Sequence, residues 1–219
     1  MSCAIFDVDG TLVDSNDAHA GAWVDAFFEH GVMVDRTLVR RCIGMGGDKL
    51  MPRVSGIEEE SDQGRRISSR RAEIFRERYL PKLRGFPRVP ELLARLEQDG
   101  VTLAVASSAK KAELRPLLEK AGATRFFDAF TSSDDADESK PDPDIIAAAL
   151  KKGKCDPASA IMIGDTPYDI EAALRAGIRA VAVRSGGWSA PDLKGASDVF
   201  DDVPDMLAQY DTRVRPLLV

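Results

Sequence analysis

The chain has 219 residues, of which 44% are hydrophobic and 30% charged, with a net charge of −6. This length allows one large domain, or one domain with a small second one, around a sizeable core. The negative charge disfavours a nucleic acid or an anionic membrane as a partner. No apolar run reaches the roughly 18 residues of a membrane-spanning helix, and the first motif follows the N-terminus too closely for a signal peptide. We therefore expect a cytoplasmic protein.

The cysteines and histidines exclude several kinds of chemistry. Cys3, Cys42 and Cys155 lie far apart without paired spacing, which favours reduced thiols and gives no zinc motif. His19 and His30 are the two histidines of the sequence, so a Ser–His or Cys–His pair is disfavoured. Carboxylates, lysine and a metal ion are left to carry the chemistry.

The predicted elements begin with a strand at Cys3–Phe6, a short apolar run before Asp7-Val8-Asp9-Gly10-Thr11. From residue 15 to residue 81 the periodicity is helical only. Helices are predicted at 17–30, 35–42, 47–54 and 58–80. The last of these is rich in Arg and Glu, which predicts a solvated helix.

Strands and helices alternate in the rest of the chain. Strands are predicted at Val101–Ala106, Phe126–Thr131, Ala160–Ile163, Ala180–Val183 and Val199–Phe200. Helices are predicted at 88–99, 110–120, 142–152, 167–176 and 203–210. This alternation predicts an α/β fold with a parallel sheet covered by helices on both faces.

The domain organisation follows from these patterns. We predict an α/β core formed by residues 1–14 and 82–219, with a helical insert at 15–81. The insert leaves the core directly after the first motif, so it is expected over the carboxyl ends of the strands. It could act there as a movable lid or pack as an ordinary helical subdomain.

Asp7 and Asp9 form the first candidate site. In an extended segment these two side chains point to the same face, at the end of a strand where α/β sheets bind ligands. Two carboxylates in one small volume repel each other unless a cation joins them, and hard oxygen ligands suit Mg²⁺. The motif predicts a magnesium site with a nucleophile, although a plain turn would use the same residue types.

Further polar groups follow the later strands. Ser107 and Ser108 could bind an anionic oxygen or cap the next helix. Lys140 lies in a proline-rich loop whose rigidity suits phosphate binding, or it is a solvated surface lysine. Asp165 and Asp169 could bind metal or cap a helix. Together these are the kinds of groups that phosphoryl transfer through an aspartyl-phosphate requires.

The ordered motifs Asp7-x-Asp9-x-Thr11, Ser107, Lys140 and Gly164-Asp165-x-x-x-Asp169 resemble the haloacid dehalogenase superfamily over essentially the whole chain. The insert, which begins Asp14-Ser15-x-x-x-His19-x-x-x-Trp23, resembles the helical cap of the phosphoglycolate phosphatase and β-phosphoglucomutase branch. The resemblance implies a Rossmann-like fold. It also implies a Mg²⁺-dependent phosphatase acting on a small phosphorylated metabolite, of the phosphoglycolate or sugar phosphate type.

The resemblance also assigns roles. It makes Asp7 the nucleophile and a Mg²⁺ ligand, and Asp9 the general acid and base, with its backbone carbonyl also on the metal. Thr11 orients the loop, Ser107 and Lys140 hold the phosphoryl oxygens, Asp165 binds the metal directly, and Asp169 supports the metal or Lys140. The expected sets are catalytic Asp7, Asp9, Thr11, Ser107 and Lys140; phosphate- or substrate-binding Gly10, Ser107, Ser108, Lys140 and His19; and metal-binding Asp7, Asp9, Asp165 and Asp169.

Other reactions of the superfamily would require different residues. The acid at Asp9 favours phosphate esters, because true dehalogenases lack it. A β-phosphoglucomutase-like mutase is the main alternative, disfavoured because Gly46-Gly47 stand where such mutases carry an arginine for the second phosphate. Three other arginines could still supply that charge: Arg40, Arg41 and Arg53. A phosphonatase would need a lysine such as Lys49. A non-catalytic phosphate-binding protein is disfavoured because every motif residue is present.

Overall fold

The computed structural model describes residues 2–127 and 130–218. Within them, the strands form a single parallel sheet in the order β3-β2-β1-β4-β5-β6. The strands are β1 Cys3–Phe6, β2 Thr102–Ala106, β3 Phe130–Thr131, β4 Ala160–Gly164, β5 Arg179–Val183 and β6 Asp198–Phe200. This is the strand order of a Rossmann-like, doubly wound sheet, so the predicted fold class is confirmed.

The central strand, β1, is buried on both faces. It pairs with β2 and β4, and Ile5 lies opposite Ala104 on one side and Met162 on the other. Side chains alternate along a strand, so Cys3 and Ile5 join one apolar layer while Ala4 and Phe6 join the other. Burial on both faces explains why these strands read as continuous apolar runs.

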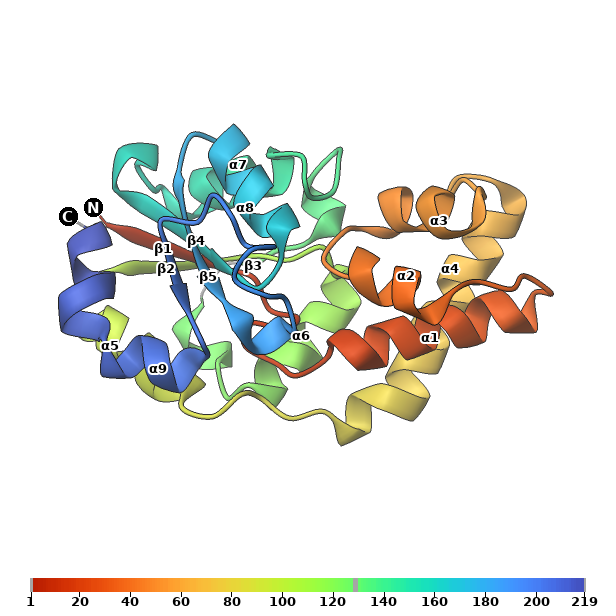
Figure 1. Cartoon of the computed structure of the whole chain (residues 1–219), viewed down its shortest axis with the longest axis horizontal. Coiled ribbons are helices and arrows are strands. Elements are labelled where there is room, and N and C mark those ends of the chain that lie inside the picture. Colours follow the sequence, from red (N-terminus) through yellow and green to blue (C-terminus); the bar gives the residue numbers. More distant parts are fainter. Residues whose placement is uncertain (1, 128–129, 219) are drawn as a thin grey trace.

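Helices cover the two faces of the sheet (Figure 1). One layer holds α7 (Asp144–Gly153) and α8 (Pro167–Arg175), whose apolar side chains cluster with Ile5. The other layer holds α5 (Val89–Gln98), α6 (Lys111–Lys120) and α9 (Val203–Ala208), which cluster with Phe6. Short 3₁₀ turns lie at Thr124–Phe126, Ser133–Asp135, Pro157–Ser159 and Arg184–Gly186, and the chain ends in a π turn at Tyr210–Val214 and a 3₁₀ turn at Arg215–Leu218.

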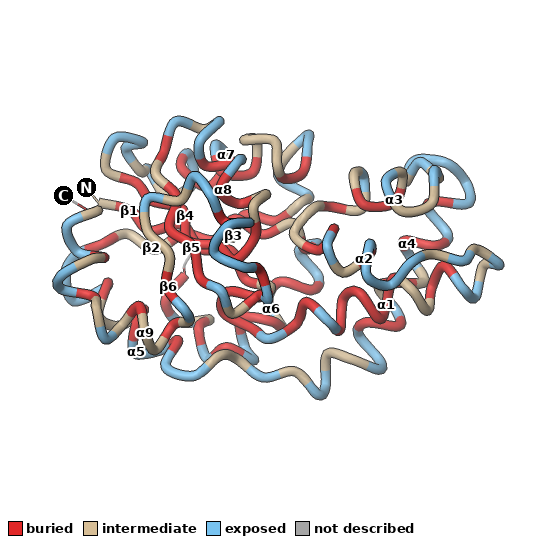
Figure 2. The backbone as a smooth tube through the Cα atoms, viewed as in Figure 1, coloured by how far each residue is buried: buried red, intermediate tan, exposed pale blue. Residues whose placement is uncertain are grey.

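A group of helices lies beyond the carboxyl ends of the strands (Figure 1). These are α1 (Asn16–Glu29), α2 (Arg36–Cys42), α3 (Gly47–Ser55) and α4 (Asp62–Ile74), followed by a π turn at Phe75–Tyr79 and a 3₁₀ turn at Leu80–Lys82. We call residues 15–81 the helical insert. Figure 2 shows burial continuing from the sheet into α1, and Phe27 and Phe75 belong to the same apolar cluster as Phe6.

Several element boundaries differ from the sequence prediction. Helix α4 begins at Asp62 because the hydroxyl of Ser61 accepts the amide of Gly64 at 3.0 Å, which caps the helix there. The predicted strand Phe126–Thr131 is too long: Phe126 ends a 3₁₀ turn, and residues 128 and 129 lie outside the described residues. None of the helices in the described ranges combines the length and apolar character needed to cross a membrane.

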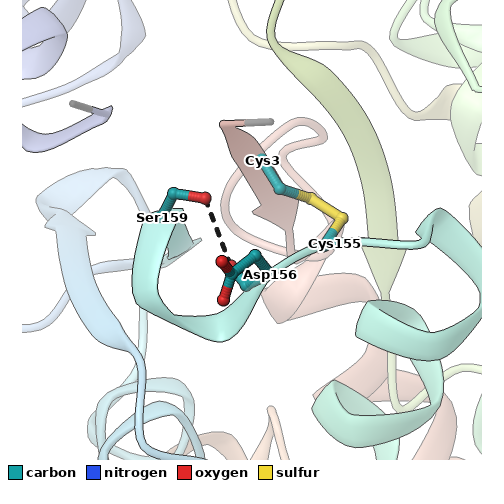
Figure 3. The surroundings of a disulfide bond; sticks show 4 residues. All are labelled: Cys3, Cys155, Asp156 and Ser159. Carbon is teal, nitrogen blue, oxygen red and sulfur yellow. Dashed lines mark hydrogen bonds between the residues drawn. A yellow bond between two sulfur atoms is a disulfide. The ribbon is translucent and has the colours of Figure 1, made fainter.

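The expectation of three reduced cysteines is wrong. Cys3 and Cys155 form a disulfide with a Cα–Cα distance of 5.8 Å (Figure 3). Cys155 precedes β4, and β4 pairs alongside β1 with Ala160 opposite Cys3. The pairing of two strands brings these residues together across a sequence separation of 152. Cys42, in the insert, is a buried free thiol.

Candidate active site

Three buried carboxylates meet at the edge of the sheet that faces the insert. Asp7 directly follows β1, Asp165 directly follows β4, and Asp169 lies in the first turn of α8. One oxygen from each lies within 4.8 Å of the others; we call these residues the carboxylate cluster. Gly10, at φ +79°, allows the close approach, because a Cβ there would lie 2.3 Å from Asp165 Oδ2.

Lys140 lies at the centre of this cluster and is fully buried. Its Nζ donates to Asp7 Oδ1 at 2.5 Å and to Asp169 Oδ1 at 2.7 Å. Burial lowers the pKa of Lys140, but the carboxylates of Asp169 and Asp7 outweigh it and raise this pKa above its ordinary value. The lysine is therefore a buried, permanently charged ammonium and not a surface residue.

The charges of this site fit a divalent cation. Fully ionised, the three carboxylates that face one ammonium would leave two negative charges without compensation in a buried volume. Burial, reinforced by Asp169, raises the pKa of the Asp165 carboxyl to about 8, and burial raises the pKa of Asp7 well above its usual range. Asn16 Oδ1 is also buried with no hydrogen-bond partner among the described residues. Such a set of hard oxygen atoms can hold a metal ion.

Asp9 has different partners. Its Oδ1 accepts the hydroxyl of Ser15 at 2.5 Å and lies 2.8 Å from His19 Nε2. Burial would raise the pKa of Asp9, but His19 and Ser15 outweigh it and hold this pKa below its usual value. The ring of His19 is held in turn by stacking on Phe75, with centroids 4.0 Å apart.

The carboxylate of Asp9 lies outside the carboxylate cluster, in contrast to that of Asp7. The same-face argument assumed extended chain through Asp9, whereas β1 ends at Phe6 and Asp9 belongs to the following turn, bridged to Val13. The predicted contribution of Asp9 to a metal site therefore depends on its backbone carbonyl. Both Asp7 and Asp9 still line one cavity.

The remaining predicted residues surround these groups. Thr11 Oγ1 donates to Asp165 Oδ1 at 3.3 Å. Ser107 follows β2, is fully buried, and its Oγ accepts the amide of Ala109 at 3.1 Å. Ser108 Oγ donates to the carbonyl of Gly44 in the insert at 2.9 Å, so its hydroxyl links core and insert. The amide of Gly10 donates to Val13 O at 2.8 Å, which closes the turn.

A cavity of about 50 Å³ lies between the core and the insert. Its core wall includes Asp7, Asp9 and Glu113, and its insert wall includes Trp23, the loop 43–47 and Arg71. A buried water needs roughly 10–15 Å³ of such space, so this cavity has room for only a few waters.

Arg71 and Glu113 were missed by the sequence interpretation, which placed 58–80 in solvent. Arg71 Nη1 donates to both carboxylate oxygens of Glu113 at 2.9 and 2.8 Å, and both residues are buried. A signal was present, because Arg71 lies four residues after Ile67 and three before Ile74, on the apolar face of α4. Ser15 and Asn16 were also missed as site residues, although Ser15 belongs to the Asp14-Ser15 motif at the entry into the insert.

The other charged residues of the insert point elsewhere. Lys49 Nζ lies 2.9 Å from Glu138 Oε2 and also contacts Asp142, forming ion pairs between insert and core. Arg40 donates to the carbonyl of Gly186 at 2.6 Å. Within the part of the chain that the structure describes, three arginines and this lysine do not line the cavity: Arg40, Arg41, Arg53 and Lys49.

A Rossmann-like sheet with a buried lysine and carboxylates at its carboxyl edge, facing an inserted helical unit, defines a class of capped α/β hydrolases. Residues 4–183 match the family described as haloacid dehalogenase-like hydrolase. The chain belongs to this family, as its motifs predicted.

Two similar proteins carry phosphatase names. The chain is 34% identical over 207 residues to "Probable phosphatase IndB" of Dickeya dadantii, covering 91% of this chain and 90% of that protein. It is 33% identical over 208 residues to the phosphoglycolate phosphatase of Agrobacterium fabrum, covering 91% and 87%. The crystal structure of a hydrolase from Pseudomonas syringae matches with a TM-score of 0.89 and 29% identity, covering 97% and 99%. The protein is therefore an enzyme of the phosphatase type.

Proposed function

We propose that the protein is a Mg²⁺-dependent phosphatase that hydrolyses a small phosphomonoester through an aspartyl-phosphate on Asp7. The observation that carries this proposal is the buried contact of Lys140 Nζ with Asp7 at 2.5 Å, beside two further carboxylates, with Asp7 itself lining the cavity. A nucleophile, a fixed cation and a set of metal ligands are thereby brought into one volume. The matched phosphatases support the same reaction class.

Asp7 attacks phosphorus. Lys140 holds the carboxylate of Asp7 in its orientation and also neutralises the charge on the phosphoryl oxygens. Mg²⁺, held by Asp7, Asp165 and Asp169, would supply further charge neutralisation and orient the phosphate. Thr11 and Asn16, which donate to Asp165 at 3.3 and 2.9 Å, fix that carboxylate in its ligating position. Ser107, at the end of β2, is proposed to bind a phosphoryl oxygen.

Asp9 moves the protons. As the leaving group departs, Asp9 donates a proton to its oxygen, and it later accepts a proton from the water that hydrolyses the aspartyl-phosphate. The low pKa of Asp9 suits the second step. For the first step, His19 lies 2.8 Å away and is placed to pass a proton to Asp9.

A sugar-phosphate mutase is the second candidate. It would need a cation in the cavity for the second phosphate of its bisphosphate. Arg71 is the arginine that lines the cavity within the described ranges, but its charge is matched by Glu113 at 2.8 Å. Hydrolysis is therefore the function that the site supports best.

The test is phosphate release from an aryl phosphate and from a panel of phosphorylated metabolites, with Mg²⁺ and with a chelator. We expect Mg²⁺-dependent release from the aryl phosphate and from a subset of the panel. Acid-quenched protein should carry a phosphoryl group on the peptide that contains Asp7. Phosphorylation at another residue, or release that persists in chelator, would contradict the proposal.

A further inference from the structure

Arg71 and Glu113 form a buried ion pair between the insert and the core that the proposed chemistry does not use. Arg71 belongs to α4 and Glu113 to α6, and each is 7% exposed. Both line the cavity that also holds Asp7 and Asp9. Their place in the cavity wall makes them candidates to contact the leaving group of a phosphomonoester that Asp7 attacks.

The guanidinium of Arg71 is fixed but incompletely paired. Its Nη1 atom is held by both oxygens of Glu113, and its plane lies over the ring of Trp23, 5.1 Å from the centroid. Its Nε is buried and has no hydrogen-bond partner among the described residues. A buried donor without an acceptor is unfavourable, so an acceptor supplied by a ligand would stabilise this arrangement.

The charge around this pair disfavours an anion. Glu113 already balances Arg71, so the pair offers no net positive charge. A second cavity of about 200 Å³ shares Gly46, Gly47 and Arg71 with the first. Its charged lining is mostly acidic: Asp48, Glu59, Glu60, Asp134 and Asp137 against Lys110 and Arg71. A carboxylate or second phosphate on the leaving group would meet these like charges.

We propose that Arg71 and Glu113 form the leaving-group subsite and select phosphomonoesters whose leaving group is hydroxylated and uncharged. This inference rests on the proposed phosphatase function. A hydroxyl can accept from the guanidinium of Arg71 and donate to the carboxylate of Glu113 at the same time, whereas a carboxylate or phosphate dianion can only accept. The pair therefore suits a polyol or sugar phosphate better than a bisphosphate or a phosphorylated acid.

The test compares substrates matched in chain length that differ in one charge. Sorbitol 6-phosphate is paired with 6-phosphogluconate, and 2-hydroxyethyl phosphate with 2-phosphoglycolate. In the wild-type protein we expect kcat/KM to favour the neutral member of each pair by about tenfold or more. A wild-type preference for the charged members would overturn the proposal.

Glu113→Gln then removes the compensating charge but keeps the shape of the side chain. The ratio of neutral to charged kcat/KM should fall by about tenfold, mainly through KM, because Arg71 becomes free to bind an anion. Arg71→Gln should raise KM for the neutral members without a gain for the charged ones. Glu119→Gln is the matched control, since Glu119 lies on the same helix, exposed and paired with Arg115, and it should leave the ratio unchanged.

Glu113→Asp, which keeps the charge, should retain the wild-type ratio and covers the case in which Glu113→Gln does not fold. An unchanged ratio in folded Glu113→Gln would mean that the pair only joins insert to core and that Arg71 Nε binds water. Failure of the proposed function gives a different result, namely no Mg²⁺-dependent release from an aryl phosphate. Calorimetric binding of the substrate pairs to Asp7→Asn tests the subsite without turnover.

Discussion

The two walls of the cavity carry different kinds of residues. The core wall carries Asp7, whose carboxylate contacts the buried Lys140; Lys140 also pairs with Asp169 of α8, and Asp165 follows the neighbouring strand β4. The insert wall carries Trp23, the loop 43–47 with its glycines, and one cation, Arg71, whose charge the core neutralises. The core wall is thus suited to stabilising a transferring phosphoryl group, and the insert wall to recognising what is attached to it.

Polar contacts join the two walls beside their shared apolar packing. Ser108 Oγ donates to Gly44 O at 2.9 Å, and Gly46 N donates to Ser139 Oγ at 3.0 Å. Exposed ion pairs such as Lys49 with Glu138 contribute little individually. We propose that these polar contacts break and re-form during turnover, with the insert acting as a lid.

The largest expected effect falls on the core wall. Asp7→Asn should lower kcat by about 10³-fold or more on every substrate, because a neutral amide cannot attack phosphorus. Steady-state kinetics on an aryl phosphate and on the preferred metabolite measure the loss. Asp14→Asn, an exposed neighbour, is the control and should keep near wild-type rates. Substantial turnover by clean Asp7→Asn protein would remove this residue from the nucleophile role.

Asp9→Asn should distinguish leaving groups. Loss of the general acid should cost about 10² to 10⁴ in kcat for alkyl phosphates, and much less for an aryl phosphate, since a phenolate departs without a proton. The measurement is a plot of log kcat against leaving-group pKa for both proteins. Equal slopes would mean that Asp9 does not protonate the leaving group.

Substitution of a disulfide cysteine and of the free cysteine tests how much each contributes to the free energy of unfolding. Cys155→Ala removes the Cys3–Cys155 link and should lower the free energy of unfolding by about 2–4 kcal/mol. Cys42→Ala, in the insert, should cost about 1 kcal/mol. Denaturant unfolding with and without reductant measures both. Reductant should destabilise the wild-type protein and Cys42→Ala but not Cys155→Ala, and an equal effect on all three would show that the disulfide does not form in solution.

Asp165→Ala should weaken metal dependence. A protein Mg²⁺ site uses only one or two carboxylates besides waters, so the Mg²⁺ concentration for half-maximal activity should rise at least about tenfold. Glu171→Ala, an exposed carboxylate on α8, serves as the control. Thermal stabilisation by Mg²⁺ gives a readout apart from activity, and unchanged stabilisation in Asp165→Ala would exclude it as a ligand.

The smallest effects should come from the insert wall. Met45→Ala enlarges the cavity and should change the ranking of metabolites by a few-fold in kcat/KM, with a smaller change for a small aryl phosphate. Arg41→Ala, whose guanidinium lies over Trp188 outside the cavity, should leave the ranking unchanged. If both variants shift all substrates equally, the insert is a scaffold and does not select substrates.

Local patterns in the sequence were enough to predict the elements and the chemistry of the core wall. Apolar runs such as Cys3–Phe6 and Ala160–Ile163 predict buried parallel strands, and the polar residue after each run must emerge at the same edge of the sheet. The motifs around Asp7, Lys140 and Asp165 therefore indicated the fold, the family and the residues that meet. This works because strand ends and turns are local features, within a few residues of the side chains they position.

Which distant groups face each other depends on three-dimensional packing that local patterns do not encode. Helical periodicity places Arg71 on the apolar face of α4, but the docking of insert on core brings Glu113 to it across 42 residues of sequence. The pairing of β1 with β4 likewise brings Cys3 to Cys155, and the fold of the turn after β1 directs Asp9 toward His19 and Ser15. Periodicity specifies the face of an element, whereas packing in three dimensions specifies its neighbour.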